Sequence, residues 1–251
     1  MKALVVGGGD SVGRAVAEAM LSRGDQVHII DVRSDAVAAT LEANPSMSGG
    51  VADFGDPTAI ERAMVEAFGA LGSIDALVYT VGLPGPSAAI EDITLADWDH
   101  CWAVNVTGLL RAIQLVTPSM KAQGGGAIVA FSTSSTRTRL PRRTPYVVTK
   151  FALEGLVLNA ARELGPAGIR VNAIQPGMID NARMRGIIDR RAAEEGVAPA
   201  DIEARFTRYI SLRSSVSLTD LAESVLFLTS PAAARITGEL LAVSGNAEWE
   251  D

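Results

Sequence analysis

The chain has 251 residues, 48% of them hydrophobic and 20% charged, with a net charge of −7 and an isoelectric point near 5.0. Its length suits one large α/β domain, and its acidic balance argues against nucleic acid or anionic membrane as a partner. The single cysteine, Cys101, cannot form an internal disulfide, so we expect a reducing compartment, the cytoplasm.

Short apolar runs alternate with amphipathic stretches along the chain. Strands are predicted at 3–6, 27–30, 76–79, 127–131, 171–174 and 240–243, with a weaker one near residue 51. Helices are predicted around 12–23, 34–43, 57–70, 95–121, 145–164 and 218–229. This alternation predicts an α/β fold of Rossmann type, a doubly wound, mostly parallel sheet with helices on both faces. Because no repeat or linker divides the chain, we expect a single domain over residues 1–251.

Two absences narrow the possible sites. No apolar run approaches the length of a signal peptide core or a membrane span, so we expect no membrane association. His28 and His100 stand far apart and accompany no cluster of metal-ligating residues, so we expect no metal.

The turn after the first strand is rich in glycine. Gly7, Gly9 and Gly13 lie between this strand and an amphipathic helix, where glycines permit a tight turn and the close approach of a pyrophosphate. Asp31 ends the second strand eighteen residues after Gly13, near the spacing expected for a carboxylate that binds an adenosine ribose. The turn therefore predicts a dinucleotide site, with a plain flexible connector as the alternative.

The stretch from Ala127 to Lys150 carries the chemistry. An apolar strand ends in five hydroxyl residues, 132–136, and an Arg-rich loop then leads to a helix that carries Tyr146 and Lys150. Their spacing of four residues places both side chains on one helix face. A phenol with a pKa of about 10 is poorly matched to proton transfer near pH 7, and a nearby ammonium lowers that pKa.

This segment resembles the active site of the short-chain dehydrogenase/reductase family, in which a Ser lies thirteen residues before the Tyr. Thr133 occupies that position here, and Ser134 is the alternative. Asn105 matches the Asn that completes the family's catalytic tetrad and implies a water relay at a helix kink. The resemblance thus implies a catalytic set of Tyr146, Lys150, Thr133, Asn105 and Ser134.

The family's cofactor motifs are only partly kept. In the pattern Thr-Gly-x-x-x-Gly-x-Gly, Val6 replaces the Thr and Ser11 replaces the middle Gly. The usual Asn-Asn-Ala-Gly after the fourth strand is Tyr-Thr-Val-Gly at 79–82, and Asp53 is either the Asp near the adenine or a turn cap. The resemblance implies cofactor contacts from Gly7, Gly9, Ser11, Val12, Gly13, Asp31, Arg33, Asp53, Phe54, Gly82, Tyr146, Lys150, Pro176, Gly177 and Ile179.

By this resemblance the protein is an NAD-dependent oxidoreductase that transfers a hydride between NAD(H) and a secondary alcohol or ketone. Asp31 favours NAD over NADP because it would repel a 2′-phosphate, whereas Arg33 is a counter-signal. Two other functions stay open. One is a degenerate member that binds a dinucleotide as a sensor without turnover, and the other is an epimerase or dehydratase on the same scaffold.

Arginines cluster in the loop before Tyr146. Arg137 and Arg139 lie nearest the hydroxyl residues, so we predict that they contact a small-molecule substrate that carries a negative charge. Solvated arginines, or arginines paired across a subunit interface, are the alternative. Residues 182–215 occupy the place of the family's substrate lid and add further arginines. The helices near 95–121 and 145–164 pair between subunits in the family, which implies a homo-oligomer, a tetramer or a dimer.

Overall fold

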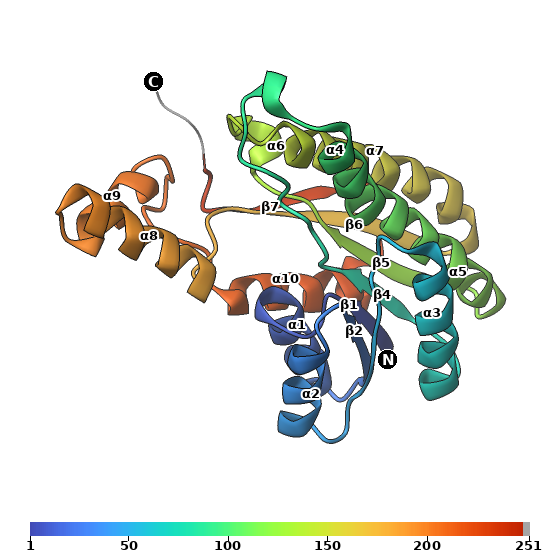
Figure 1. Ribbon diagram of the computed structural model, residues 1–251. Coiled ribbons are helices and arrows are strands. Elements are labelled where there is room, and N and C mark those ends of the chain that lie inside the picture. Colours follow the sequence, from blue (N-terminus) through green and yellow to red (C-terminus); the bar gives the residue numbers. More distant parts are fainter. Residues whose placement is uncertain (248–251) are drawn as a thin grey trace.

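Parallel strands form the centre of the protein. The computed structural model describes residues 1–247 and contains one seven-stranded sheet (Figure 1). Its strands are β1 (Lys2–Val6), β2 (Gln26–Asp31), β3 (Ser48–Val51), β4 (Ala76–Tyr79), β5 (Gly126–Phe131), β6 (Ile169–Pro176) and β7 (Leu240–Val243). They are all parallel, in the order β3-β2-β1-β4-β5-β6-β7. The predicted fold class is confirmed, and the weak run near Val51 is a real edge strand.

Helices follow the strands as the alternation predicted. The main helices are α1 (Ser11–Ser22), α2 (Ser34–Ala43), α3 (Pro57–Leu71), α4 (Leu95–Trp102), α5 (Gly108–Ala122), α7 (Thr144–Leu164), α8 (Ala182–Glu195), α9 (Pro199–Thr207) and α10 (Leu218–Thr229). Short helical turns are η1 (Ile90–Asp92), η2 (Ala103–Thr107), α6 (Ser135–Thr138), η3 (Gly165–Ala167) and η4 (Pro231–Ala233).

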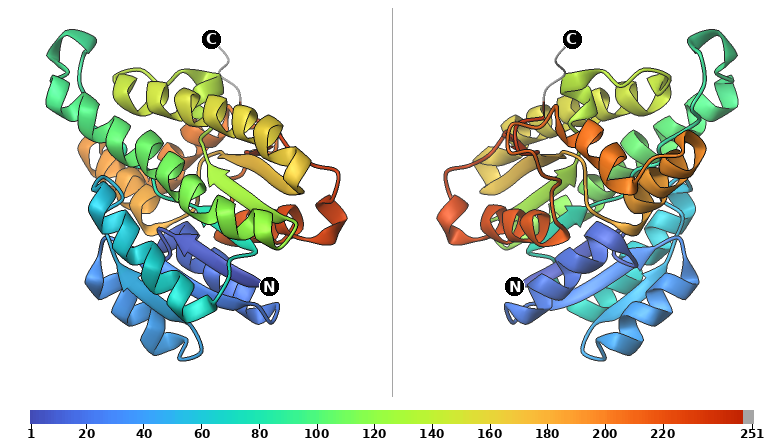
Figure 2. Two further views of the ribbon diagram at one scale, coloured as in Figure 1. Left: turned by 90° about the vertical axis from the view of Figure 1, so that its right-hand side faces the viewer. Right: turned by 90° about the vertical axis from the view of Figure 1, so that its left-hand side faces the viewer.

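Each face of the sheet has its own apolar layer. Along β1, Leu4 and Val6 pack with α3, α5 and α7, whereas Ala3 and Val5 pack with α1, α2 and α10 on the opposite face (Figures 1 and 2). This follows from the two-residue period of a strand, which sends neighbouring side chains to opposite faces. Because both faces are covered, the strands read as unbroken apolar runs in the sequence.

The single helix predicted over 95–121 is interrupted. Residues Ala103–Thr107 form a π-helix, η2, between α4 and α5. One extra residue in a helical turn shifts the hydrogen-bonding register and leaves backbone carbonyls for side-chain donors. The Tyr79 side chain donates to one such carbonyl, that of Val104, and Asn105 of the π-helix belongs to the candidate site described below.

Beyond the sheet, α8 and α9 project as a small helical pair (Figure 1). They enclose a separate apolar cluster of Ile188, Ala192 and Ile202. The segment 182–215, which is charged and irregular in sequence, therefore contains two helices and a small apolar core of its own. A bridge between Ile179 and Val216 joins the two ends of this segment at the sheet.

Candidate active site

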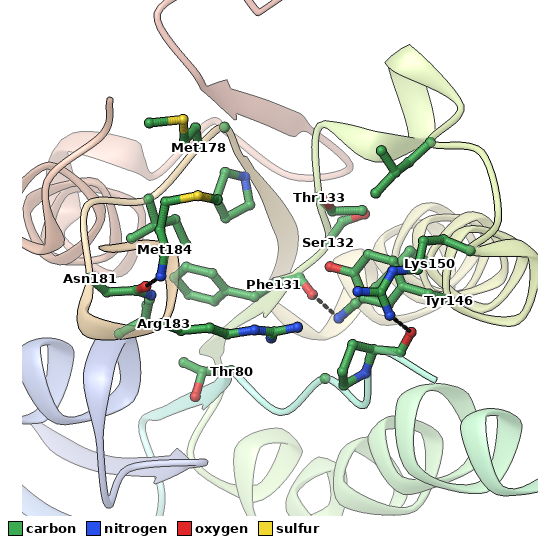
Figure 3. A pocket seen from close by; sticks show the side chains of 18 of the residues that line it. Thr80, Phe131, Ser132, Thr133, Tyr146, Lys150, Met178, Asn181, Arg183 and Met184 are labelled. Atoms are coloured by element: carbon green, nitrogen blue, oxygen red, sulfur yellow. Dashed lines mark hydrogen bonds between the residues drawn. The ribbon is translucent and has the colours of Figure 1, made fainter. Parts of the chain in front are cut away.

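The carboxyl ends of β5 and β6 border a cavity with a volume of about 390 Å³ (Figure 3). Ligands of open α/β sheets bind at this edge, near the point where the strand order reverses, here between β1 and β4. The cavity is lined by Val12, Thr80, Gly82, Pro84, Phe131, Ser132, Thr133, Leu140, Arg143, Tyr146, Lys150, Pro176, Gly177, Met178, Ile179, Asn181, Arg183, Met184 and Ile187.

Lys150 lies at the base of this cavity on α7. Its Nζ donates hydrogen bonds to the backbone oxygens of Phe131 at 2.6 Å and Val81 at 3.4 Å. Burial lowers the pKa of Lys150 from 10.5 to about 8, and the nearby carboxylate of Glu154 opposes this shift. The ammonium is therefore fixed in place and held close to its titration range at neutral pH.

Tyr146 lies one helix turn before Lys150, and the Lys150 Nζ is 6.0 Å from the centre of its ring. Burial raises the pKa of the Tyr146 phenol above 10, while a hydrogen bond with Thr133 and the charges of Arg183 and Arg143 act in the opposite direction. The expected lowering of this pKa by Lys150 is absent, because the ammonium is turned to the two carbonyls. The positive charges of Arg183 and Arg143, not that of Lys150, act to lower the pKa of the Tyr146 phenol.

The three hydroxyls at the end of β5 have different surroundings. Thr133 lines the cavity and bonds the Tyr146 phenol, and its Oγ1 accepts the Ser135 N–H at 3.1 Å. Ser134 does not line the cavity, and its N–H is bonded to the Pro176 oxygen on β6. Ser132 lines the cavity but donates its hydroxyl to Glu154 at 2.5 Å. Thr133 is thus the hydroxyl placed beside the phenol, and Ser134 is not.

Glu154 is a polar residue of the site that our sequence reasoning missed. Its buried Oε1 accepts hydrogen bonds from Ser132, Thr136 and Gln175, at 2.5, 2.8 and 2.8 Å. These donors come from the ends of β5 and β6 and from α6, so one carboxylate ties three elements to α7. Its position four residues after Lys150, on the same helix face, is the signal that could have found it.

Asn105 lies in the π-helix and is completely buried. Its Oδ1 accepts the Leu83 N–H at 2.7 Å, and its Nδ2 donates to the Leu83 oxygen at 3.0 Å and to Thr149 Oγ1 at 2.9 Å. Thr149 precedes Lys150 on α7, so Asn105 connects the loop after β4 to the helix that carries Tyr146. A π-helix interrupts the helix at this position, and protein groups satisfy the amide of Asn105.

The two residues that replace the family's paired Asn have new partners. Thr80 Oγ1 donates toward the Val6 oxygen at 2.9 Å and lies 3.2 Å from the Gly7 oxygen, and so supports the glycine-rich turn. Tyr79 is buried and donates its phenol to the Val104 oxygen inside the π-helix at 2.7 Å. Burial raises the pKa of Tyr79, which keeps the phenol protonated as this donor.

The glycine-rich turn has the geometry that its sequence predicted. A Cβ on Gly13 would lie 1.9 Å from the Gly7 oxygen, and Gly7 has a φ of +84°. Ser11, in place of the family's middle Gly, is forced to a φ of +47°, a region that side chains seldom occupy. Its Oγ accepts a hydrogen bond of 3.3 Å from Asn181, which caps α8. The substitution thus links the turn to the projecting helices.

The remaining predicted cofactor residues divide into two groups. Val12, Gly82, Tyr146, Lys150, Pro176, Gly177 and Ile179 line the cavity, whereas Gly7, Gly9, Ser11, Gly13, Asp31, Arg33, Asp53 and Phe54 do not.

The second group lies along the ends of β1 to β3. Asp31 accepts the Gly9 N–H at 3.0 Å, and Arg33 forms a 2.8 Å ion pair with Asp10. Asp53 is exposed and caps the turn through Gly55, the alternative left open by the sequence. Phe54 needs correction as a side-chain contact, because its ring is buried against Tyr79 in the core.

A nicotinamide dinucleotide fits these residues. The glycine-rich turn leads into the N-terminus of α1, where its backbone can approach phosphates, and Asp31 places a carboxylate at the end of β2. A Cβ on Gly82 would lie 3.0 Å from the Lys150 Nζ, a tight contact, so glycine leaves more room beside this ammonium.

The prediction that Arg137 and Arg139 contact the substrate needs correction, because neither lines the cavity. Arg137 and Arg139 are exposed and outside the cavity wall, since Arg139 ends α6 in a left-handed conformation and folds its guanidinium onto the Arg137 oxygen. Arg143 and Arg183 line the cavity in their place. Loop position alone did not determine which arginine points inward.

Comparison with known proteins agrees with this geometry. The model of a protein family described as enoyl-(acyl carrier protein) reductase matches residues 7–245. The chain belongs to the short-chain dehydrogenase/reductase family. The description applies to the family model and leaves this member's own reaction open.

Relatives of this family cover nearly the whole chain. A probable galactose dehydrogenase of Rhizobium meliloti is 33% identical over 96% of this chain and 93% of its own length. A sorbitol dehydrogenase of Cereibacter sphaeroides is 31% identical over 97% and 95%. A crystal structure of 7α-hydroxysteroid dehydrogenase with NADH and 7-oxo glycochenodeoxycholic acid superposes with a TM-score of 0.88 at 28% identity, over 99% and 94%. These relatives are oxidoreductases.

Two further observations concern residues 1–247. No helix there combines the length and apolar character that crossing a bilayer requires. No three His, Cys, Asp or Glu side chains in this range come together as a metal site would need.

Proposed function

We propose that this short-chain dehydrogenase/reductase interconverts a secondary alcohol and a ketone with NAD(H) as cofactor. The observation that carries the proposal is the Tyr146 phenol hydrogen-bonded to Thr133, one helix turn from the buried Lys150, inside a cavity at the carboxyl edge of the sheet. Relatives named for galactose and sorbitol oxidation support a hydroxyl-bearing substrate.

In this mechanism the side chains position the substrate oxygen and move its proton. Tyr146 exchanges the proton with that oxygen, while Thr133 holds the oxygen against the phenol. Lys150 places a positive charge below them, and its lowered pKa lets it take part in proton exchange near neutral pH. Asn105 positions Thr149 and therefore the turn that carries Tyr146 and Lys150; a water relay at this turn stays a prediction. When bound, the nicotinamide supplies or accepts the hydride.

Tyr146→Phe tests this proposal, because it keeps the ring and removes only the proton donor. We expect kcat to fall by roughly 100-fold or more, the usual size of an acid–base contribution. Absorbance of the reduced nicotinamide follows turnover, and calorimetry follows NAD binding, which should change little. Near-native turnover by the variant would refute the assigned chemistry.

The preference for NAD rests on Asp31. Its carboxylate stands at the end of β2, and the guanidinium of Arg33 is engaged by Asp10. A 2′-phosphate there would meet a like charge, so we expect kcat/KM for NAD to exceed that for NADP by roughly 100-fold. Asp31→Asn should narrow this ratio, whereas Asp35→Asn, on the neighbouring helix, should not. Equal use of both cofactors by the unmodified enzyme would contradict the assignment.

Two other functions are distinguished by the same assays. A dinucleotide sensor would bind NAD without turning over any alcohol or ketone, and the eroded motif at 79–82 is the feature that favours it. An epimerase or dehydratase would release product without a net change in reduced cofactor. The intact pair of Tyr146 and Lys150 supports the oxidoreductase over the sensor.

Further parts of the proposal concern assembly and surroundings. We propose that α8 and α9 act as the substrate lid and that the enzyme is a homo-oligomer, a tetramer or a dimer. The reducing cytoplasm is the compartment that suits the single, buried Cys101. We also propose an anionic substrate, with the arginines reassigned as argued next.

A further inference from the structure

The wall of the cavity beside Tyr146 carries more positive than negative side chains. Of the residues in 1–247 that line it, three are cationic, Arg143, Lys150 and Arg183, and none is acidic. The whole chain has a net charge of −7, so this excess of positive charge is local to the cavity. A cleft lined by one sign of charge concentrates ligands of the opposite sign.

Lys150 is already engaged by backbone carbonyls, which leaves the two arginines facing the cavity. Arg143 directly precedes α7, three residues before Tyr146. Its Nη1 donates to the oxygens of Pro84 at 3.3 Å and Gly85 at 3.0 Å. These neutral acceptors hold the guanidinium at the cavity rim without cancelling its charge, and its other N–H groups stay available.

Arg183 reaches the cavity from the opposite side. It is the second residue of α8, and its side chain extends across the cavity toward the side where Lys150 and Tyr146 lie (Figure 3). Within residues 1–247 neither Arg183 nor Arg143 forms an ion pair. Arg185, two residues further along α8, is by contrast neutralised outside the cavity by Asp180, at 2.8 Å.

Both guanidinium groups are also close to the reacting phenol. Each lowers the pKa of Tyr146 by its charge, against the larger effect of burial. Arg143 precedes α7 and Arg183 belongs to α8, so the two guanidinium groups come from two different elements that border the cavity.

We propose that Arg143 and Arg183 form a subsite that binds an oxyanionic group of the substrate, a carboxylate or a phosphate, while Tyr146 binds its carbonyl or hydroxyl oxygen. A guanidinium fork matches both anions and can bind them through two parallel hydrogen bonds. The subsite rests on the proposed function, since it assigns to the same cavity a hydroxy acid or oxo acid, or a phosphorylated equivalent.

The cavity wall also carries apolar side chains. Leu140, Met178 and Met184 are among them. Apolar lining of this kind lowers the local dielectric constant, which strengthens an ion pair formed inside the cavity. Arg183 belongs to α8, so a bound anion would also tie the proposed lid to α7 and favour closure.

Binding of simple anions tests the subsite without any need for turnover. Calorimetry with sodium malonate and with inorganic phosphate is compared for the unmodified enzyme, Arg143→Gln and Arg183→Gln. We expect each change to weaken binding of at least one probe by roughly tenfold or more, the cost of a lost charge-assisted bond. The preferred probe identifies the anion as carboxylate or phosphate. Arg142→Gln and Arg185→Gln are matched controls from the same segments and should bind as the unmodified enzyme does.

The outcomes are distinct. No binding of either probe by the unmodified enzyme, or unchanged binding in both variants, overturns the subsite. If phosphate binds only at the glycine-rich turn, both variants would bind it as the unmodified enzyme does, and this unchanged binding would overturn the subsite. Because Arg143 also supports the loop at 84–85, a melting curve checks the fold of its variant. Arg183 forms no ion pair within residues 1–247, so Arg183→Gln gives the decisive comparison.

A substrate panel separates failure of the subsite from failure of the proposed function. Hydroxy acids are assayed with NAD beside their neutral amides. We expect the acids to have the higher kcat/KM, and Arg183→Gln to reduce that advantage by roughly tenfold. If neutral alcohols are turned over with a kcat/KM that neither arginine substitution changes, and acids have no advantage, the oxidoreductase assignment stands and the subsite is refuted. Anion binding at the arginines without any redox turnover would do the reverse.

Discussion

Lys150 places a positive charge where almost no water reaches it. Only 2% of its surface is exposed, and its partners are two carbonyl oxygens, with the Glu154 carboxylate one turn further along α7. Desolvation dominates over these favourable contacts, which is why its pKa falls to about 8. The sequence spacing predicted the neighbourhood of Tyr146 and Lys150, and burial determined which charge state each of them favours.

This lysine predicts a dependence of stability on pH. The unfolded chain keeps the Lys150 proton to about its ordinary pKa of 10.5, whereas the folded protein releases it near 8. Between these values the unfolded state binds more protons, so the free energy of unfolding rises with pH. Relative to Lys150→Met, the unmodified protein should gain up to about 3 kcal/mol across this window. Urea unfolding at several pH values measures the difference, with the exposed Lys121→Met as control. A flat difference would contradict the prediction.

The π-helix η2 connects the altered motif at residues 79–82 to α7, the helix that carries Tyr146 and Lys150. Tyr79 donates a hydrogen bond to the oxygen of Val104 in the π-helix. Asn105, the residue after Val104, forms hydrogen bonds with Leu83 and Thr149. A Cβ on Gly108 would lie 2.6 Å from the Tyr79 phenol oxygen, so the small residue at the start of α5 makes room for this tyrosine. Tyr79, which departs from the family pattern, is thus accommodated by a glycine at position 108.

Tyr79→Phe should show what this contact contributes. The change removes one hydroxyl and leaves the Val104 oxygen without its donor in the core, which should lower the free energy of unfolding by about 1–3 kcal/mol. Because Asn105 adjoins Val104, we also expect kcat to fall while NAD binding changes little. Denaturant unfolding and steady-state kinetics measure the two effects. A variant that matches the parent in both would exclude a positioning role for the phenol.

At the scale of the whole molecule, large apolar side chains on α5 and α7 are partly exposed to solvent. Leu110 on α5 and Phe151 and Leu158 on α7 are 40–45% exposed, over the face of the sheet that these helices cover. Exposed apolar surface is typical of subunit interfaces when it is contiguous, as it would be if these side chains adjoin. This is the physical support for the proposed homo-oligomer.

Light scattering at micromolar concentration tests this assembly. We expect the mass of a tetramer or a dimer, and we expect Phe151→Glu combined with Leu158→Glu to give a smaller species, because burying two carboxylates without partners opposes association. Val65→Glu, on the exposed side of α3, is the control and should leave the mass unchanged. A monomeric mass for the unmodified chain would exclude the assembly.

The sequence alone determined the strands, most of the helices between them and the segment that carries Tyr146 and Lys150. These depend on local periodicity and on short spacings, such as the buried run of β1 and the four residues between phenol and ammonium, which a linear pattern records directly. The glycine-rich turn was also readable, because the contact of Gly13 with Gly7 arises within seven residues.

Only the tertiary structure decided which polar side chains meet. Glu154 gains its donors from β5, β6 and α6, and Tyr79 finds its acceptor 25 residues away, at Val104. Arg143 and Arg183 face one cavity although 40 residues separate them, while Arg137 and Arg139, nearer to the hydroxyls in sequence, point outward. The direction of a side chain depends on backbone conformation and on packing between distant elements, and neither is set by the neighbouring residues alone.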